Sequence, residues 1–273
     1  MGEDAITGHY RRAGLEEEIL AALRESGLAA SVDTLAPVDE FHTGGRRMTA
    51  SLVDRLDLHP GSRVLDVGCG IGGTARYIAA TRGAEVTGID LTPEYVAAAR
   101  ALTEKAGPAG LVRFDRGDGT DLPYPDGSFD AACAIHTGMN IERKDLLAAG
   151  LARVLRAGGR LAVFDIMRTG DGEVGHPTPW AATAATSFLA DPRSYRGLLE
   201  EAGFEVVHER DWSAAVLDAL RRGPERAPAG GAPPLGPHLL MGERAEEKRA
   251  NVNDAVRRGI VAPVEMIAVA PGP

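Results

Sequence analysis

VLDVGCGIGG, residues 64–73, is the stretch of this sequence that decides the fold class. A β-branched, apolar run breaks into four glycines and then enters a helical pattern over residues 74–81. Glycines at such a turn let the backbone bend sharply and approach a ligand closely, because no Cβ stands in the way. The stretch therefore predicts a strand, a ligand-binding loop and a helix.

Asp66 lies two residues before the first of these glycines, at the end of the predicted strand. A carboxylate there would repel a phosphate group, whereas it suits a cationic or hydroxyl-bearing part of a ligand. The acid therefore favours S-adenosylmethionine as the ligand of a loop that otherwise matches a general nucleotide-binding turn.

The rest of the chain alternates between strand and helix patterns. Strands are predicted at residues 63–67, 85–90, 111–116, 129–135, 160–165, 204–209 and 263–270. Helices are predicted at residues 14–26, 46–56, 74–81, 93–106, 144–155, 195–202 and 243–257. Such alternation indicates a parallel sheet with helices on both faces. No compact crossover helix precedes the last strand, so we expect that strand to insert antiparallel.

We therefore predict an α/β fold, a Rossmann-like, seven-stranded, mostly parallel sheet in a single domain. The expected divisions are an N-terminal helical cap (1–58), a cofactor-binding core (59–211), a helical cover with a Pro/Gly-rich loop (212–262), and the last strand and tail (263–273). Residues 221–237 are rich in Pro, Gly and Ala and also fit an interdomain linker. Too few residues follow for a second core, so we interpret them as an insertion loop.

Composition narrows the class of function. The chain has 273 residues, 25% of them charged, and a net charge of -9, which argues against a nucleic-acid partner. No apolar run reaches the roughly 18 residues of a membrane-spanning helix, and the start MGEDAITGHYRR lacks a signal-peptide pattern. Cys69 and Cys133 lack metal-ligand spacing, so we expect a cytoplasmic chain with reduced thiols and no catalytic metal.

Two further carboxylates follow predicted strands. The glycine-rich loop alone also fits the GxGxxG fingerprint, so a purely structural turn and a nicotinamide-dependent oxidoreductase stay open as alternatives. Asp90 ends the second predicted strand, where a carboxylate can accept hydrogen bonds from both ribose hydroxyls. Asp118 follows the third predicted strand, where its side chain can reach the adenine amino edge. The alternative for Asp118 is a turn residue before Gly119.

Four segments, in this order within residues 60–211, resemble the motifs of class I S-adenosylmethionine-dependent methyltransferases: VLDVGCGIGG, VTGIDLT, GDGTDLPYPDGSFDAACAIH and LARVLRAGGRLAVFD. A narrower resemblance, to the sarcosine/dimethylglycine and related small-molecule subgroup, is carried by DEFHTGG, HTGMNI, PWA and the tail HLLMGERAEEKRANV…APVEMIA. Thr137 and Gly138 replace the Gln-containing segment usual in that subgroup. The acceptor therefore stays open between a small amine and a natural-product intermediate.

The resemblance implies S-adenosylmethionine as the cofactor and S-adenosylhomocysteine as its product. The cofactor-binding residues on the matched positions are Phe41, His42, Asp66, Gly68, Cys69, Gly70, Asp90, Leu91, Asp118, Gly119 and Ile135. By the same resemblance, Asp66 lies beside the methionine moiety, Asp90 binds the ribose, and Phe41 and His42 belong to a segment that closes over the cofactor.

His136, just past the fourth predicted strand, is the candidate catalytic residue. We hypothesise that it positions or deprotonates the methyl acceptor, because imidazole titrates near neutral pH. A bond to nearby backbone is the alternative role. The candidate acceptor-site residues are Met139, Asn140, Trp180 and Met241, and a place in the core is equally compatible for Trp180.

The expected partner is a small-molecule methyl acceptor, with no nucleic acid and no membrane. The sequence does not indicate the oligomeric state, for which a homodimer is one option. A second alternative keeps the fold and the cofactor but acts as a cyclase or a ligand-binding protein, because a fold does not fix a function.

Overall fold

The computed structural model describes residues 8–10, 12, 14–222 and 234–272. A seven-stranded sheet runs through the molecule in the order β3-β2-β1-β4-β5-β7-β6. The strands are β1 (Arg63–Val67), β2 (Glu85–Asp90), β3 (Val112–Arg116), β4 (Phe129–Ile135), β5 (Leu155–Arg168), β6 (Glu205–Asp211) and β7 (Val261–Val269). The first five strands pair in parallel, and β7 lies antiparallel between β5 and β6. The predicted mostly parallel sheet with an antiparallel last strand is confirmed.

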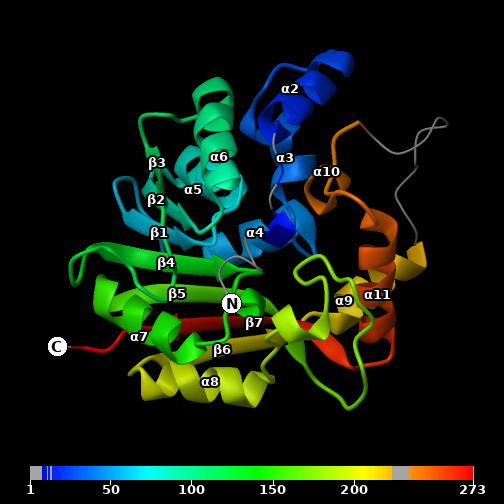
Figure 1. Ribbon diagram of the computed structural model, residues 1–273. Helices are drawn as coiled ribbons and strands as arrows, with labels where there is room; N and C mark the ends of the chain where they lie inside the picture. Colours follow the sequence, from blue (N-terminus) through cyan, green and yellow to red (C-terminus); the bar gives the residue numbers. More distant parts are fainter. Residues whose placement is uncertain (1–7, 11, 13, 223–233, 273) are drawn as a thin grey trace.

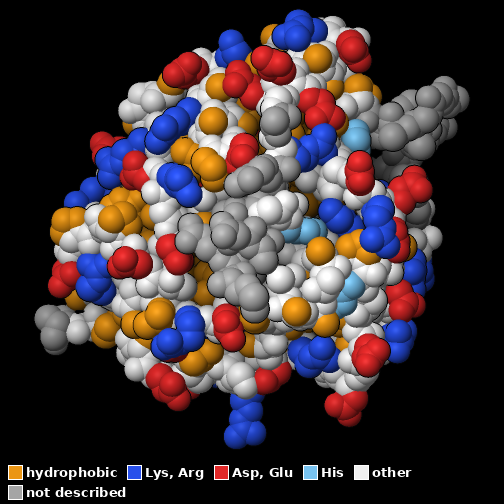
Figure 2. All heavy atoms as spheres, viewed as in Figure 1, with side chains coloured by type: hydrophobic (Ala, Val, Ile, Leu, Met, Phe, Trp, Pro, Cys, Tyr) orange, Lys and Arg blue, Asp and Glu red, His pale blue; other side chains and the backbone are white. Residues whose placement is uncertain are grey.

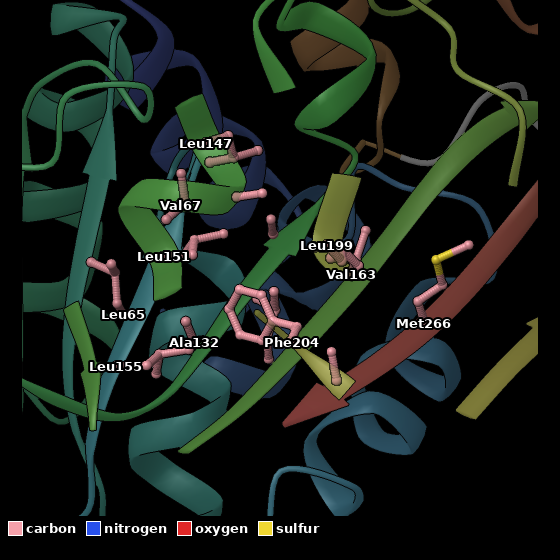
Figure 3. Close-up of a cluster of buried hydrophobic side chains, with 14 of the residues drawn as sticks. Leu65, Val67, Ala132, Leu147, Leu151, Leu155, Val163, Leu199, Phe204 and Met266 are labelled. Carbon is pink, nitrogen blue, oxygen red and sulfur yellow. The ribbon is translucent and has the colours of Figure 1, made fainter. Parts of the chain in front are cut away.

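Helices cover both faces of the sheet (Figure 1). On one face, α7 (Lys144–Val154) and α8 (Pro192–Glu201) bury leucines against the strands, and Figure 3 shows Leu147, Leu151 and Leu199 meeting this core. On the other face lie α4 (Gly45–Asp54), α5 (Gly73–Arg82) and α6 (Pro93–Ala106). The strands are thus apolar on both sides, as buried parallel strands must be.

Two further apolar clusters lie beyond the carboxyl ends of the parallel strands. One joins α2 (Leu15–Glu25), α3 (Val32–Asp39), α6 and α10 (His238–Met241). The other joins α11 (Ala245–Arg257) to the segment after β5 through side chains that include Met139 and Trp180. A third helix between β6 and β7, α9 (Ser213–Arg222), contacts α11. These elements stand over the strand ends, where ligands bind in open α/β sheets.

The structure differs from the sequence prediction at the end of α7. The helix was predicted to run to residue 155 and the strand to begin at residue 160, but α7 ends at Val154 and β5 begins at Leu155, ahead of Gly158 and Gly159. The glycines instead lie inside β5, where the pairing with β4 is irregular between Phe129 and Ala131. Gly158 there has a φ of 72°, a backbone conformation that glycine adopts readily.

Helices α3, α9 and α10 were not among the predicted helix ranges, although α9 and α10 lie within the stretch predicted as a helical cover. α3 has only eight residues and contains Pro37, so its sequence lacks a long helical period. It is stabilised by a capping box, in which the Ser31 hydroxyl accepts from the Thr34 N–H and the Thr34 hydroxyl accepts from the Ser31 N–H. Most of the predicted insertion loop 221–237 lies outside the described residues. None of the helices described combines the length and apolar character needed to cross a bilayer.

Candidate functional site

A cavity of about 410 Å³ opens at the carboxyl ends of the parallel strands. Its volume falls within the roughly 300–1,000 Å³ of small-molecule sites. The predicted site residues that line it are Phe41, His42, Asp66, Gly68, Cys69, Gly70, Asp90, Leu91, Asp118, Gly119, Ile135, His136, Met139, Asn140 and Trp180. Segments from the cap, from the ends of four strands and from the chain after β5 therefore meet at one place.

The glycine-rich loop after β1 approaches the segment after β4 very closely. Gly68 has a φ of 70°, and its N–H donates to the Ile89 carbonyl at 2.8 Å. A Cβ at this position would lie 2.2 Å from the Thr137 hydroxyl oxygen. Gly70, with a φ of 53°, also lies in the left-handed region. Residues with a Cβ rarely adopt such a backbone conformation, so the sharp glycine turn predicted from the sequence requires glycine here.

Asp66 is buried at the floor of the cavity. Its Oδ1 accepts from the Cys133 thiol at 3.4 Å, whereas its buried Oδ2 has no hydrogen-bond partner. Burial raises the pKa of Asp66 to about 7, and the Cys133 hydrogen bond offsets only part of this effect. An unpaired buried carboxylate oxygen is costly, and an ammonium or hydroxyl donor from a ligand would satisfy it.

Asp90 ends β2 and holds the neighbouring loops. Its Oδ2 accepts from the Gly70 N–H at 2.8 Å, and its Oδ1 accepts from the Thr92 N–H at 2.8 Å. Each carboxylate oxygen retains a lone pair for a further donor. Asp90 can therefore bind two hydroxyl groups while fixing the loop that surrounds them.

Asp118 and Leu91 line the same part of the cavity, near the ends of β2 and β3. Asp118 is exposed, and its Oδ1 accepts from the Thr120 N–H at 2.8 Å, so the turn role and a ligand contact are both compatible with this position. Gly119 packs closely: a Cβ there would lie 2.8 Å from Val67.

His136 follows β4 in an unusual backbone conformation. Its φ is 52°, its N–H donates to the Phe164 carbonyl at 2.7 Å, and its ring stacks on Phe164 at 5.3 Å. The Nε2 atom is buried and has no hydrogen-bond partner. Burial, together with nearby His42, lowers the pKa of His136 well below its usual range. The residue lines the cavity, and its imidazole is neutral with one ring nitrogen left without a partner.

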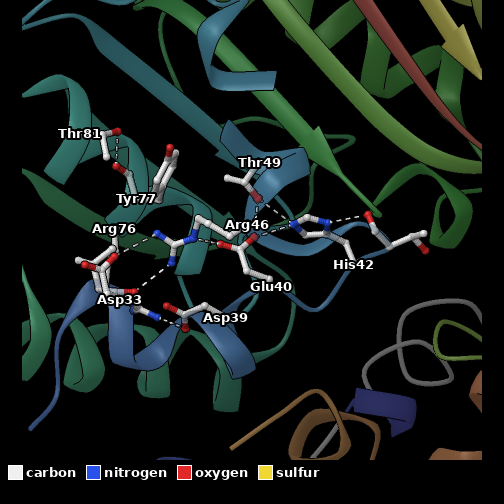
Figure 4. Close-up of polar contacts among 11 residues, drawn as sticks. Asp33, Asp39, Glu40, His42, Arg46, Thr49, Arg76, Tyr77 and Thr81 are labelled. Carbon is white, nitrogen blue, oxygen red and sulfur yellow. Dashed lines mark hydrogen bonds and ion pairs between the residues drawn. The ribbon is translucent and has the colours of Figure 1, made fainter. Parts of the chain in front are cut away.

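His42 belongs to a polar network on the cap (Figure 4). Its Nε2 lies 2.8 Å from Glu40 and 2.9 Å from the Thr49 hydroxyl, and its Nδ1 lies 3.2 Å from the Thr43 carbonyl. Glu40 also pairs with Arg46 at 2.5 Å. Burial by itself would raise the pKa of Glu40, but these partners hold it below its usual value. Because both ring nitrogens are engaged, His42 is fixed in place.

A buried ion pair that the sequence analysis missed ties the cap to the loop. Arg76 of α5 donates to Asp39 at the end of α3 at 2.5 Å, and both side chains are fully buried. Arg76 also donates to the Ile71 carbonyl at 2.8 Å and to Thr103 at 3.0 Å. No spacing rule connects residues 37 positions apart, so only the folded chain reveals this pair.

The sequence analysis also missed Asp165 in β5, which binds the backbone of the segment after His136. Its carboxylate accepts from the Thr137 N–H at 2.9 Å and from the Gly138 N–H at 3.1 Å. A Cβ at Gly138 would lie 2.3 Å from that carboxylate. The Thr137-Gly138 pair therefore holds the segment after His136 in place through backbone donors, which explains why a glycine stands there.

Three of the four residues predicted for the acceptor site line the cavity, and one does not. Met139, Asn140 and Trp180 line the cavity, while Met241 is absent from its lining residues and its neighbour Leu240 is present. Trp180 is also core, because it is 3% exposed and its Nε1 donates to Ser187 at 2.9 Å. Tyr10 and Phe188 also line the cavity and were not predicted. Their sequence surroundings carry no motif.

Two further observations concern surface charge and possible metal ligands. On the face shown in Figure 2, acidic and basic side chains are intermingled over the coloured residues, without a continuous basic patch. Among the residues that the structure describes, no group of three or more His, Cys, Asp or Glu side chains could hold a metal ion.

Comparisons with known proteins find methyltransferases among the relatives of this chain. The model of a family described as "Methyltransferase domain" matches residues 65–163. The chain is 35% identical over 179 residues to methyltransferase GfsG of Streptomyces halstedii, covering 64% of each chain. It is 32% identical over 178 residues to O-methyltransferase rstn1 of Aspergillus nomiae, covering 63% of this chain and 77% of that relative.

Among solved structures, the [4+2]-cyclase SpnF superimposes with a TM-score of 0.64 at 23% identity, covering 95% of this chain and 96% of that chain. This likeness concerns the fold. The chain spans about two thirds or less of the length of several curated relatives that it matches, GfsG included.

Proposed function

This chain belongs to the class I S-adenosylmethionine-dependent methyltransferase family, and on that premise we propose that it methylates a nucleophilic atom of a small molecule. The observation that carries the proposal is one cavity that brings together Asp66, Asp90 and the free Nε2 of His136. The first two suit the cofactor and the third suits an acceptor.

The cavity fits S-adenosylmethionine at three points. Asp90 would accept hydrogen bonds from the two ribose hydroxyls, and the unpaired Oδ2 of Asp66 would accept from the ammonium group of the methionine moiety. Asp118 would face the adenine amino edge, with Leu91 against the ring. The buried free oxygen of Asp66 is the strongest part of this fit, because a vacant acceptor there is costly without a ligand.

When bound, S-adenosylmethionine supplies a methyl group on a sulfonium, which is already a good leaving group. The protein's own contribution is therefore mainly alignment, exclusion of water and removal of a proton. Correct alignment contributes as much as about 7–11 kcal/mol in well-oriented cases, more than a typical general base. We propose that neutral His136 accepts the acceptor's proton at Nε2, and that its fixed backbone and the stacked Phe164 hold the ring.

The test is a methyl-transfer assay on cell extract with isotope-labelled S-adenosylmethionine, in which S-adenosylhomocysteine and labelled product are quantified together. In His136→Asn, kcat should fall by about 10²–10⁴-fold, since one general base is removed. Asparagine tolerates the left-handed backbone at this position, so the fold should persist. The dissociation constant for S-adenosylhomocysteine should change less than about twofold.

Full kcat in His136→Asn would remove His136 from the mechanism. Product formed without S-adenosylhomocysteine would instead favour the cyclase alternative, and stabilisation by NAD but not by S-adenosylhomocysteine would favour the oxidoreductase alternative. We also propose a cytoplasmic location, which the two free, buried cysteines support.

A further inference from the structure

The sheet order separates the two ends of the cavity. Asp90 ends β2 and Asp118 follows β3, on one side of β1. On the other side, His136 follows β4, and Pro179, Trp180 and Phe188 follow β5. A ligand that uses both carboxylates therefore leaves the wall after β4 and β5 for the acceptor. The chemistry of this wall, which we call the acceptor wall, indicates what it can bind.

Among the described residues, the acceptor wall offers no unpaired Lys or Arg side chain. Among the lining residues that the structure describes, Arg143 is the single Lys or Arg, and its side chain is 61% exposed. Its guanidinium donates to Asp145 at 2.9 Å and 2.6 Å. Neighbouring Lys144 does not line the cavity, and its Nζ donates to the Ile141 and Phe188 carbonyls. A phosphate or carboxylate would lose its water here without gaining a counter-ion, which is unfavourable.

The acceptor wall also offers little to a cation. Glu142 lines the cavity but is exposed, so water screens its charge. The unpaired oxygen of Asp66 lies beside the glycine-rich loop and belongs to the cofactor end. A protonated amine would moreover have no free lone pair for the methyl group and would face a sulfonium of like charge.

What remains is a largely apolar surface whose polar side chains include Asn140 and His136. Met139, Trp180, Phe188 and Leu240 supply apolar side chains. Trp180 Nε1 is already bonded to Ser187, and the Tyr10 hydroxyl donates to Asn140 at 3.2 Å. The Nε2 of His136 is buried and free, and a neutral imidazole nitrogen without a proton accepts a hydrogen bond.

We infer that the methyl acceptor is an uncharged, largely apolar molecule that presents a hydroxyl group to Nε2 of His136, so that oxygen is methylated. This inference rests on the proposed function. The acceptor oxygen forms a bond to the methyl carbon, the carbon–sulfur bond breaks with its electron pair kept by sulfur, and the hydroxyl proton passes to Nε2.

The experiment measures binding of three matched probes to the full chain saturated with S-adenosylhomocysteine. The probes share one ring system and differ in the polar group: 2-naphthol is neutral, 2-naphthyl phosphate is anionic, and 2-naphthylmethylamine is cationic at pH 7.5. We expect 2-naphthol to bind at least about tenfold more tightly than either charged probe, since about 1.4 kcal/mol of unmatched desolvation suffices for that ratio. Calorimetry gives the three dissociation constants.

Variants show whether His136 recognises the hydroxyl. In His136→Phe the preference for 2-naphthol over naphthalene should disappear, while His59→Gln, a change of an exposed histidine outside the cavity, should preserve it. His136→Asn should keep part of the preference, because its amide can accept the same hydrogen bond. This rescue separates recognition from a loss of structure.

Equal or tighter binding of either charged probe would overturn the inference, and so would failure of all three probes to bind the loaded protein. Failure of the proposed function has a different signature, because S-adenosylhomocysteine would then not bind, or would bind without any methyl transfer from S-adenosylmethionine.

Discussion

The two ends of the cavity are built in different ways. At the cofactor end, the contacts come from strand ends that lie within about sixty residues of one another, and glycine backbone and carboxylates dominate. At the acceptor end, the cavity is lined by Tyr10, the segment after β4, Leu240, and Pro179, Trp180 and Phe188 after β5. The first end is local in sequence, and the second is assembled from the whole chain.

This difference has a physical cause. A ligand moiety bound by backbone and by carboxylates at strand ends requires fixed spacing between residues, because parallel strands deliver their carboxyl ends to one edge. An apolar wall requires only volume and shape, which many residue combinations supply. Single substitutions at the cofactor end should therefore lower ligand affinity strongly, whereas those on the acceptor wall should change it by smaller steps.

The largest effect should come from Gly68→Ala. The added Cβ would lie 2.2 Å from the Thr137 hydroxyl, and Thr137 cannot move easily because it donates to the Val67 carbonyl at 3.0 Å and to Asp165 at 2.9 Å. We expect the affinity for S-adenosylhomocysteine to fall about a hundredfold or more, by calorimetry, through about 1–3 kcal/mol of strain plus the clash.

Gly61→Ala is the matched control, since Gly61 has a φ of 82° but open space around its Cβ position. It should lose some thermal stability and keep its affinity. If Gly68→Ala binds as well as Gly61→Ala, the close approach of the loop to Thr137 does not matter for the cofactor.

Asp66→Asn should lower the affinity for the cofactor but raise the free energy of unfolding of the ligand-free protein at high pH. Burial raises the pKa of the native carboxyl to about 7, whereas an unfolded one titrates near about 3.9. Folding is therefore favoured by the protonated form, and this contribution is lost as the pH rises from the lower value through the higher one. Asparagine does not ionise, so at pH 8 the free energy of unfolding of the variant should exceed that of the wild type by at most about 4 kcal/mol.

Urea unfolding of the ligand-free protein at pH 5 and pH 8 measures this difference, and calorimetry measures the expected drop in cofactor affinity of about tenfold. A variant whose stability follows the wild-type pH profile would show that Asp66 does not titrate as inferred.

The smallest effect is expected from Arg143→Ala on the acceptor wall. Its exposed pair with Asp145 supports neither the core nor, by our inference, an acceptor anion. The dissociation constant of 2-naphthyl phosphate for the loaded protein should change less than about twofold. A clear loss of phosphate binding would mean that Arg143 turns toward the acceptor, and the contrast between the two ends would weaken.

The elements predicted from periodicity correspond closely to the structure in the core. The bounds of β1, β2, β4 and α6 are as predicted and β3 differs by one residue, whereas β5 begins five residues earlier and ends three residues later than predicted. α3 could not be found in this way, because a short helix with an internal proline is stabilised by its cap and by burial of Leu35 and Val38. The two adjacent acids at positions 39 and 40, just before FHTGG, were the one feature of the sequence that indicated polar contacts at the end of α3.

For the site, the sequence by itself determined where the glycine-rich turn, Asp66, Asp90, Asp118 and His136 lie. Each stands at or just after the end of a strand, and the spacing along the chain fixes that position. Only the tertiary structure decided that Asp39 pairs with Arg76, that Leu240 and not Met241 reaches the cavity, and that Nε2 of His136 is left free. These depend on which side chains meet across distant segments, and packing sets that without any local rule.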